Sequence, residues 1–202
     1  MSENFTSPDF YNIDELLSEE HKLIRESTRQ WVPKSVSPII EEYAQKAEFP
    51  SHLIKELGEI GAFGPYIPEK YGGAGLDQIS YEIMMQEIER GDSGIRSTAS
   101  VQSSLVMGAI IKYGVDEQKS RFLPRLASGE LMGCFGLTEP EAGSDATSQK
   151  TTAHETSEHY ILNGTKNWIT NGNSASVYLV IAQSDPEKKH KGINAFIVER
   201  NW

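Results

Sequence analysis

The stretch Gly133–Thr151, GCFGLTEPEAGSDATSQKT, marks the point at which the character of the sequence changes. An apolar run stops at a Thr-Glu-Pro corner and gives way to the small residues 142–144, Ala-Gly-Ser, and then to Asp145. Pro140 cannot continue a strand, because it has no N–H donor. Small residues let successive N–H groups point in one direction, and such a nest suits anions, phosphates especially. From these residues alone, ligand binding and an ordinary exit from a strand into a loop are equally weighted interpretations.

The sequence before this stretch is typical of helices, and the sequence after it is typical of strands. Amphipathic patterns predict six helices, with Ser51 and Asp116 as caps. These helices lie at about 13–31, 36–47, 52–61, 79–89, 97–113 and from 116 onward. Past Gly129, turn signals separate short β-rich runs, which are GCFGLT, HYILNGT, KNWITNG, SVYLVIAQS and NAFIVER. The predicted fold is α+β, with an N-terminal all-helical domain over residues 1–130 and the first part of a β domain, barrel-like in character, over 131–202.

The last run of the sequence, INAFIVERNW, ends just as a strand would be pairing. A β domain of about five short strands would leave exposed edges, which proteins ordinarily pair or cover. We therefore expect the sequence to be incomplete, with the rest of the β domain beyond Trp202.

Composition disfavours several classes of function. Acidic residues outnumber basic ones by 29 to 19, a net charge of −10, which disfavours nucleic acid and anionic membranes as partners. The longest apolar runs, YLVIA and LVMGAII, are too short to span a membrane. Cys134 is the only cysteine, so an intrachain disulfide is impossible and a reducing compartment is expected. The five histidines lack metal-ligand spacing, and no metal site is expected.

A second unusual segment is KNWITNG, Lys166–Gly172. Trp168 stands there among short polar residues, between Asn-Gly turns on both sides. A core tryptophan normally lies in a longer apolar run, so this ring is a candidate platform for a planar ligand. Packing in the core is the equally weighted alternative.

A third segment, GDSGIRSTASVQSSLVMG, covers residues 91–108. If it is helical from about residue 96, four residues lie along one face. They are Arg96, Ser100, Ser103 and Met107. A guanidinium at the head of this row suits a carboxylate, held by two parallel hydrogen bonds, although a solvated first turn is favoured from the residues alone. Glu89 comes seven residues earlier, but two intervening glycines prevent any assignment to the same face.

These three segments, in this order, resemble the acyl-CoA dehydrogenase family. CFGLTEPEAGSD is similar to its first flavin-binding signature, KNWITNG to its second, and YGVDEQKSRFLPRLASGE to its helical connector. The resemblance runs over nearly the whole chain and is firmest between Glu82 and Asn171. Within the family, IERGDSGIRSTASVQSSLVMG is most similar to glutaryl-CoA dehydrogenase, although Ile95 and Thr98 stand where bulkier residues are expected.

The resemblance implies that FAD is the cofactor. Thr138 would bond the pyrimidine side of the flavin ring, Gly143 and Ser144 would meet phosphates, and the residues from Trp168 to Thr170 would cover the ring near N5. The implied cofactor-binding residues are Phe135, Gly136, Leu137, Thr138, Glu139, Pro140, Glu141, Ala142, Gly143, Ser144, Trp168, Ile169 and Thr170.

The resemblance also implies the substrate contacts. Arg96 would hold the far carboxylate of glutaryl-CoA, with Ser97 and Ser100 beside it. Glu89 would orient the guanidinium, and Ser144 would touch the CoA part of the substrate.

The implied reaction is α,β-dehydrogenation of the acyl-CoA thioester, followed by loss of CO₂ to give crotonyl-CoA, with electrons passed to an electron-transfer flavoprotein. The family's catalytic Glu belongs to a C-terminal four-helix domain beyond Trp202, so no catalytic residue is expected in this chain. The full-length protein would be a homotetramer, in the bacterial cytoplasm or, after processing, in the mitochondrial matrix. The alternatives are a short-chain acyl-CoA dehydrogenase, against which Arg96 argues, an acyl-CoA oxidase, and a non-catalytic half-protein that binds flavin and CoA.

Overall fold

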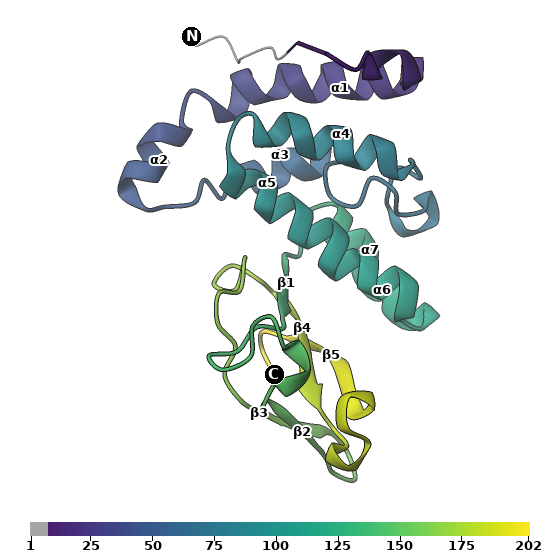
Figure 1. The fold of residues 1–202 in the computed structure, drawn as a ribbon, viewed down its shortest axis with the longest axis vertical. Coiled ribbons are helices and arrows are strands. Elements are labelled where there is room, and N and C mark those ends of the chain that lie inside the picture. The colour runs from purple at the N-terminus through teal and green to yellow at the C-terminus, as the bar shows by residue number, and fades with distance from the viewer. Residues whose placement is uncertain (1–7) are drawn as a thin grey trace. The chain divides into compact units, whose positions relative to one another are not determined.

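The computed structural model describes residues 8–202 and divides the chain into two compact units, which join between Glu130 and Leu131 (Figure 1). The first unit is helical, and the second contains a five-stranded mixed sheet. The predicted order, a helical domain followed by a β domain, is therefore confirmed.

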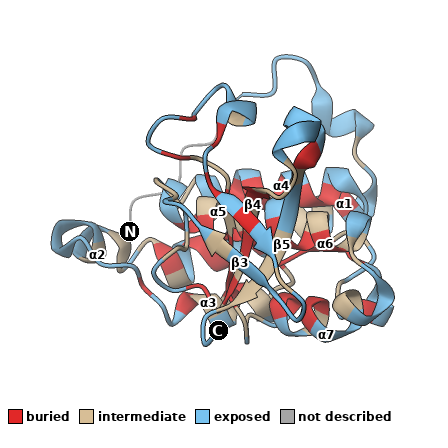
Figure 2. Ribbon diagram, turned by 90° about the horizontal axis from the view of Figure 1, so that it is seen from below, coloured by how far each residue is buried: buried red, intermediate tan, exposed pale blue. Residues whose placement is uncertain are grey.

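Helices of three kinds build the first unit. The α-helices are α1 (Glu19–Trp31), α2 (Ile40–Lys46), α3 (Leu53–Glu59), α4 (Gln78–Glu89), α5 (Ser93–Ser100), α6 (Gly108–Tyr113) and α7 (Asp116–Ala127). Two 3₁₀ turns, η1 (Ile13–Leu16) and η3 (Glu69–Tyr71), and two π-helical segments, η2 (Val32–Val36) and η4 (Val101–Met107), complete it. α1 packs along α4, and η4 joins α5 to α6 in one continuous rod (Figure 1). Buried residues recur along α1, α4 and α7 and along strand β4 of the second unit, whereas α2 has none (Figure 2).

Capping residues set two helix starts that apolar periodicity does not predict. Oγ of Ser18 accepts from the His21 amide at 3.2 Å, so α1 begins at Glu19 and not at about residue 13. Oδ1 of Asp92 accepts from the Ile95 amide at 2.8 Å, so α5 begins at Ser93 and not at about residue 97.

Other predicted helix ends also need correction. Ser51 does not cap α3, because its hydroxyl donates to the carbonyl of Phe49. α1 ends at Trp31 and continues directly into η2, which contains Pro33, and the helix predicted at 36–47 shortens to α2. α7 begins with Asp116 as its first residue, and Val115 is the residue that precedes it as cap.

The sheet of the second unit is built around β4 (Val177–Gln183). β4 pairs with β5 (Ile193–Glu199) in antiparallel register over its whole length and with β1 (Gly133–Gly136) in parallel register. Its last residue also meets β2 (Thr152–Glu155), which forms an antiparallel hairpin with β3 (Tyr160–Asn163). Short 3₁₀ segments lie at η5 (Ala146–Ser148) and η6 (Pro186–Gly192).

One predicted strand is wrong and one strand was missed. KNWITNG is a loop, because Trp168 and Asn171 take left-handed φ values of 58° and 65°, which no strand accepts. β2 was not predicted, since its four residues follow directly on the polar turn and only Ala153 is buried.

Candidate functional site

The chain leaves β1 through a two-residue turn whose tip is Pro140 and Glu141. The Glu139 amide donates to the carbonyl of Ala142 at 3.0 Å, and the Ala142 amide donates back to the carbonyl of Glu139 at 3.3 Å. Gly143, which follows, is exposed, and a Cβ built there would meet no atom within 4 Å. Since its φ is not left-handed either, nothing in the described chain requires a glycine at this position. A bare backbone facing open space is suited to close approach by a ligand.

Unsatisfied donors gather on this turn. Within residues 8–202, the amide and the hydroxyl of Thr138 have no hydrogen-bond partner, and neither do the amides of Gly143 and Ser144. Phe135 and Leu137 are half-buried, while Gly136 between them is buried in the sheet. The turn therefore offers several hydrogen-bond donors to an oxygen-rich ligand.

Trp168 lies on the surface in an uncommon conformation. It is 92% exposed, so the ring is not packed in a core within residues 8–202, and its φ is 58°. A left-handed backbone costs a residue with a Cβ about 1–2 kcal/mol, and such strain gathers at functional sites. No described residue accepts from the amides of Trp168, Ile169 or Thr170. The loop thus holds an indole ring and open donors toward solvent.

Glu139 occupies a different place from the rest of the turn. Its side chain is 4% exposed and pairs with the ammonium of Lys166 at 2.7 Å. Burial opposes ionisation, but the bonds from Lys166, Thr151 and Lys150 prevail and lower the pKa of Glu139 to about 2. The Glu139 carboxylate is thus hydrogen-bonded within the protein, and cofactor binding by this residue stays a prediction.

Arg96 and Glu89 come together at the corner between α4 and α5. Nε of Arg96 donates to Oε2 of Glu89 at 2.5 Å, and Nη1 reaches Oγ of Ser100 at 3.3 Å. Ser93 donates to the other oxygen of Glu89 at 2.6 Å. Arg96 and then Ser93 lower the pKa of the Glu89 carboxyl. Ser97 is half-buried, and its carbonyl accepts from Ser100 at 3.2 Å.

The row predicted to continue from Arg96 bends away at η4. Ser103 is buried, where its hydroxyl accepts from the Gly64 amide at 2.8 Å, and Met107 is fully buried. A π-helix has more residues in each turn than an α-helix, so the α-helical spacing fails there. Ser104, which is absent from the predicted row, is exposed one turn after Ser100. Its hydroxyl donates to the carbonyl of Ser100 at 2.7 Å.

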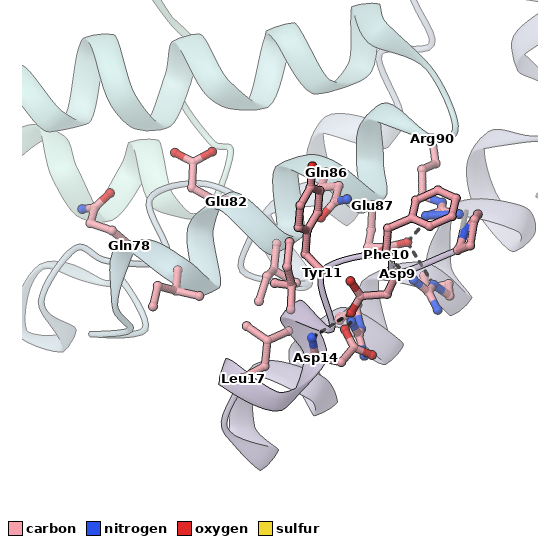
Figure 3. Close-up of a pocket in the computed structure, with 16 residues that line it drawn as sticks. Asp9, Phe10, Tyr11, Asp14, Leu17, Gln78, Glu82, Gln86, Glu87 and Arg90 are labelled. Atoms are coloured by element: carbon pink, nitrogen blue, oxygen red, sulfur yellow. Dashed lines mark hydrogen bonds and ion pairs between the residues drawn. The ribbon is translucent and has the colours of Figure 1, made fainter. Parts of the chain in front are cut away.

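A separate cavity of about 840 Å³ lies between the N-terminal segment and helices α1 and α4 (Figure 3). Its three arginines are already paired, Arg25 with Asp14 at 2.5 Å, and Arg29 and Arg90 with Glu87 at 2.8 and 3.7 Å. None of the residues that the sequence analysis selected lines this cavity.

Two general features of the described residues bear on function. Across residues 8–202, no three His, Cys, Asp or Glu side chains are grouped as a metal ion would need. In the same part of the chain, every helix is too short or too polar to cross a membrane.

Comparison with known proteins accounts for both units. The family described as acyl-CoA dehydrogenase, N-terminal domain, matches residues 18–130, and the acyl-CoA dehydrogenase middle domain matches residues 134–202. The chain belongs to the acyl-CoA dehydrogenase family. The two domain matches meet where the helical unit gives way to the sheet.

Individual relatives within this family carry different substrate names. An acyl-CoA dehydrogenase of Bacillus subtilis is 41% identical over 92% of this chain and 49% of its own length. The mitochondrial short-chain specific acyl-CoA dehydrogenase of Rattus norvegicus is 40% identical over 90% of this chain and 44% of its own. A glutaryl-CoA dehydrogenase from Mycobacterium smegmatis, solved in complex with FADH2, is 44% identical with a TM-score of 0.88, over 94% of this chain and 47% of that one. The chain thus spans about half the length of these relatives.

Proposed function

We propose that this chain supplies the flavin-binding and acyl-CoA-binding half of an FAD-dependent acyl-CoA dehydrogenase whose substrate is glutaryl-CoA. The observation that carries the flavin part is Trp168, an exposed ring on a strained backbone. The observation that carries the substrate part is Arg96, held at the start of α5 by Glu89.

The residues around the β1 turn fit a flavin dinucleotide. The free amide and hydroxyl of Thr138 can bond the polar edge of the ring, and Trp168 can cover one of its faces. The open backbone at Gly143 and the exposed Ser144 suit the phosphates of FAD or CoA. Backbone donors explain how a chain with a net charge of −10 could hold such anions without a broad basic face.

Arg96 fits the distal carboxylate of a dicarboxylic acyl chain. Glu89 engages Nε and Ser100 accepts one hydrogen bond from Nη1, whereas Nη2 has no partner within residues 8–202, so N–H donors remain on the edge that Nη1 and Nη2 form. A carboxylate binds such an edge through two parallel hydrogen bonds. A plain fatty acyl chain has no group for this cation, which is why we propose glutaryl-CoA rather than butyryl-CoA.

The proposed reaction removes an α-proton and a β-hydride from the thioester and leaves an α,β-double bond. The bond between the γ-carbon and the distal carboxylate then breaks, which releases CO₂, and uptake of a proton gives crotonyl-CoA. Bound FAD supplies the acceptor for the hydride. The residues of this chain bind and orient, since positioning contributes much of such a rate enhancement. We assign the proton-abstracting Glu, by resemblance, to the family's C-terminal helical domain, and we propose an electron-transfer flavoprotein as acceptor and a homotetramer as the assembly.

Anaerobic titration of the purified flavoprotein tests the proposal, with glutaryl-CoA and butyryl-CoA as probes and the visible flavin band as the readout. We expect glutaryl-CoA to bleach the band at lower concentration than butyryl-CoA. The reverse order would make the protein a short-chain enzyme. A band that neither probe bleaches would indicate a binding half without turnover. Rapid return of a bleached band when air is then admitted would indicate an oxidase.

A further inference from the structure

Lys166 connects the two segments that the proposed function assigns to the flavin. Its ammonium donates to the carbonyl of Leu137 at 2.9 Å, to Glu139 at 2.7 Å and to Oε1 of Gln149 at 3.0 Å. A lysine has three donors, and all three are used here. The next residue adds a second connection, because the Asn167 amide donates to the carbonyl of Thr138 at 2.9 Å.

Glu139 completes this network from the other side. Besides Lys166, its carboxylate accepts from the amides of Lys150, at 2.5 Å, and Thr151, at 3.0 Å. Three stretches of chain, at 137–139, 149–151 and 166–167, therefore meet at one ion pair. The side chains of Lys166 and Glu139 are only 12% and 4% exposed.

Stability alone is a poor reason for such a pair. Removing two charges from water costs several kcal/mol, and well-packed apolar residues often serve equally well. What an ion pair with every donor and acceptor satisfied adds is a single geometry. Here that geometry sets the spacing between Thr138 and the Trp168 loop, whose own backbone is strained.

We propose that Lys166 and Glu139 form a positioning pair, which holds residues 137–138 and the Trp168 loop at the spacing that the flavin ring requires. Neither side chain touches the cofactor; both act through the segments that they join. This inference rests on the proposed function, because it presupposes that both segments bind FAD.

Three variants of the purified protein test it. Lys166→Met leaves the carboxylate of Glu139 buried and unpaired, whereas Glu139→Gln with Lys166→Met removes both charges. The matched control is Asp185→Asn with Lys188→Met, which removes an exposed ion pair of the same unit, 2.7 Å long. For each protein, the measurements are the unfolding midpoint of the apoprotein, the Kd for FAD from flavin fluorescence, and the visible spectrum of the bound flavin.

We expect Lys166→Met to lower the midpoint of the apoprotein and the double change to recover only part of it, because Gln has one oxygen to accept from the two amides of Lys150 and Thr151. The double variant should still bind FAD about tenfold or more weakly and show a shifted flavin band, since small misplacements of a binding group have effects of this size. The control should match the wild type in its affinity for FAD and in its flavin spectrum. Wild-type affinity and spectrum in the double variant would overturn the positioning role and leave the proposed function intact.

A conservative change covers the case in which the double variant does not fold. Lys166→Arg keeps the charge but replaces a point donor with a longer planar fork, so the bond to the carbonyl of Leu137 must change. We expect an apoprotein of near wild-type stability with weakened FAD binding, and an unchanged Kd would overturn the proposal. A wild-type protein that binds no FAD would instead refute the proposed function, and the inference with it.

Discussion

Nε of Arg96 lies 2.5 Å from Oε2 of Glu89, although Glu89 is the last residue of α4 and Arg96 belongs to the first turn of α5. The corner between the two helices brings them together. Asp92 caps α5, and Gly91 packs so closely on Val32 that a Cβ would approach its Cγ1 to 2.6 Å. The guanidinium is therefore held on one edge by a structure that folding itself provides.

Replacing Arg96 with Met should reduce kcat/KM for glutaryl-CoA about 100-fold, because truncating one partner of a desolvated charge pair costs about 2–5 kcal/mol. Turnover of butyryl-CoA should change little, since that chain has no distal carboxylate. The measurement is steady-state kinetics with both substrates on the assembled enzyme that also supplies the proton-abstracting Glu of the proposed function. Arg125→Met, which breaks a surface pair with Glu130, is the matched control. Equal losses with both substrates would show that Arg96 does not bind the carboxylate.

Replacing Asp92 with Ala should remove the cap of α5. We expect a loss of about 1 kcal/mol in the free energy of unfolding, the usual value for an N-cap aspartate. Because the first turn carries Arg96, discrimination between glutaryl-CoA and butyryl-CoA should weaken as well. Chemical denaturation and the ratio of the two kcat/KM values check these effects. Loss of stability with an unchanged ratio would mean that Glu89 alone fixes Arg96.

Replacing Trp168 with Asn should separate stability from cofactor binding. Asn adopts the left-handed region with less strain than an aromatic residue, and the exposed ring contributes little packing. The apoprotein should unfold at the same temperature or slightly higher, while the Kd for FAD rises. Trp202→Asn, at another exposed tryptophan, is the control for loss of a surface ring. Unchanged flavin affinity in the Trp168 variant would remove the ring from the cofactor site.

Apolar periodicity predicted the helical domain, the β domain and most of the strands, because burial of one face imposes that period locally. It failed where other forces decide. Ser18 and Asp92 set helix starts through single hydrogen bonds, and η4 shifts Ser103 from the predicted row into the core. The loop at Trp168 looked like a strand, since no local pattern reports a left-handed φ.

The site was partly predictable for a similar reason. The motif at 137–144 and the residue types at Arg96 and Trp168 are visible in the sequence. The network at Glu139 was not, because Lys166 comes 27 residues later and only the fold brings the two together. An acidic residue in a turn looks exposed from sequence alone, whereas this one is buried with its charge retained.

The stability of the second unit should depend on acid pH through Glu139. Its pKa falls from the ordinary 4.5 to about 2 on folding, so the stabilisation is complete above about pH 4.5 and is lost as the pH falls toward 2. A shift of this size corresponds to about 3 kcal/mol. Denaturant unfolding of the apoprotein between about pH 5 and about pH 2 measures this loss, and the wild type should lose more stability across this window than the Glu139→Gln, Lys166→Met double variant.

Glu141→Gln with Lys150→Met, at an exposed ion pair, is the control. It should retain the wild-type dependence of stability on pH, because solvent screens that pair. Parallel slopes for the wild type and the Glu139 double variant would mean that this carboxylate is not held ionised by folding.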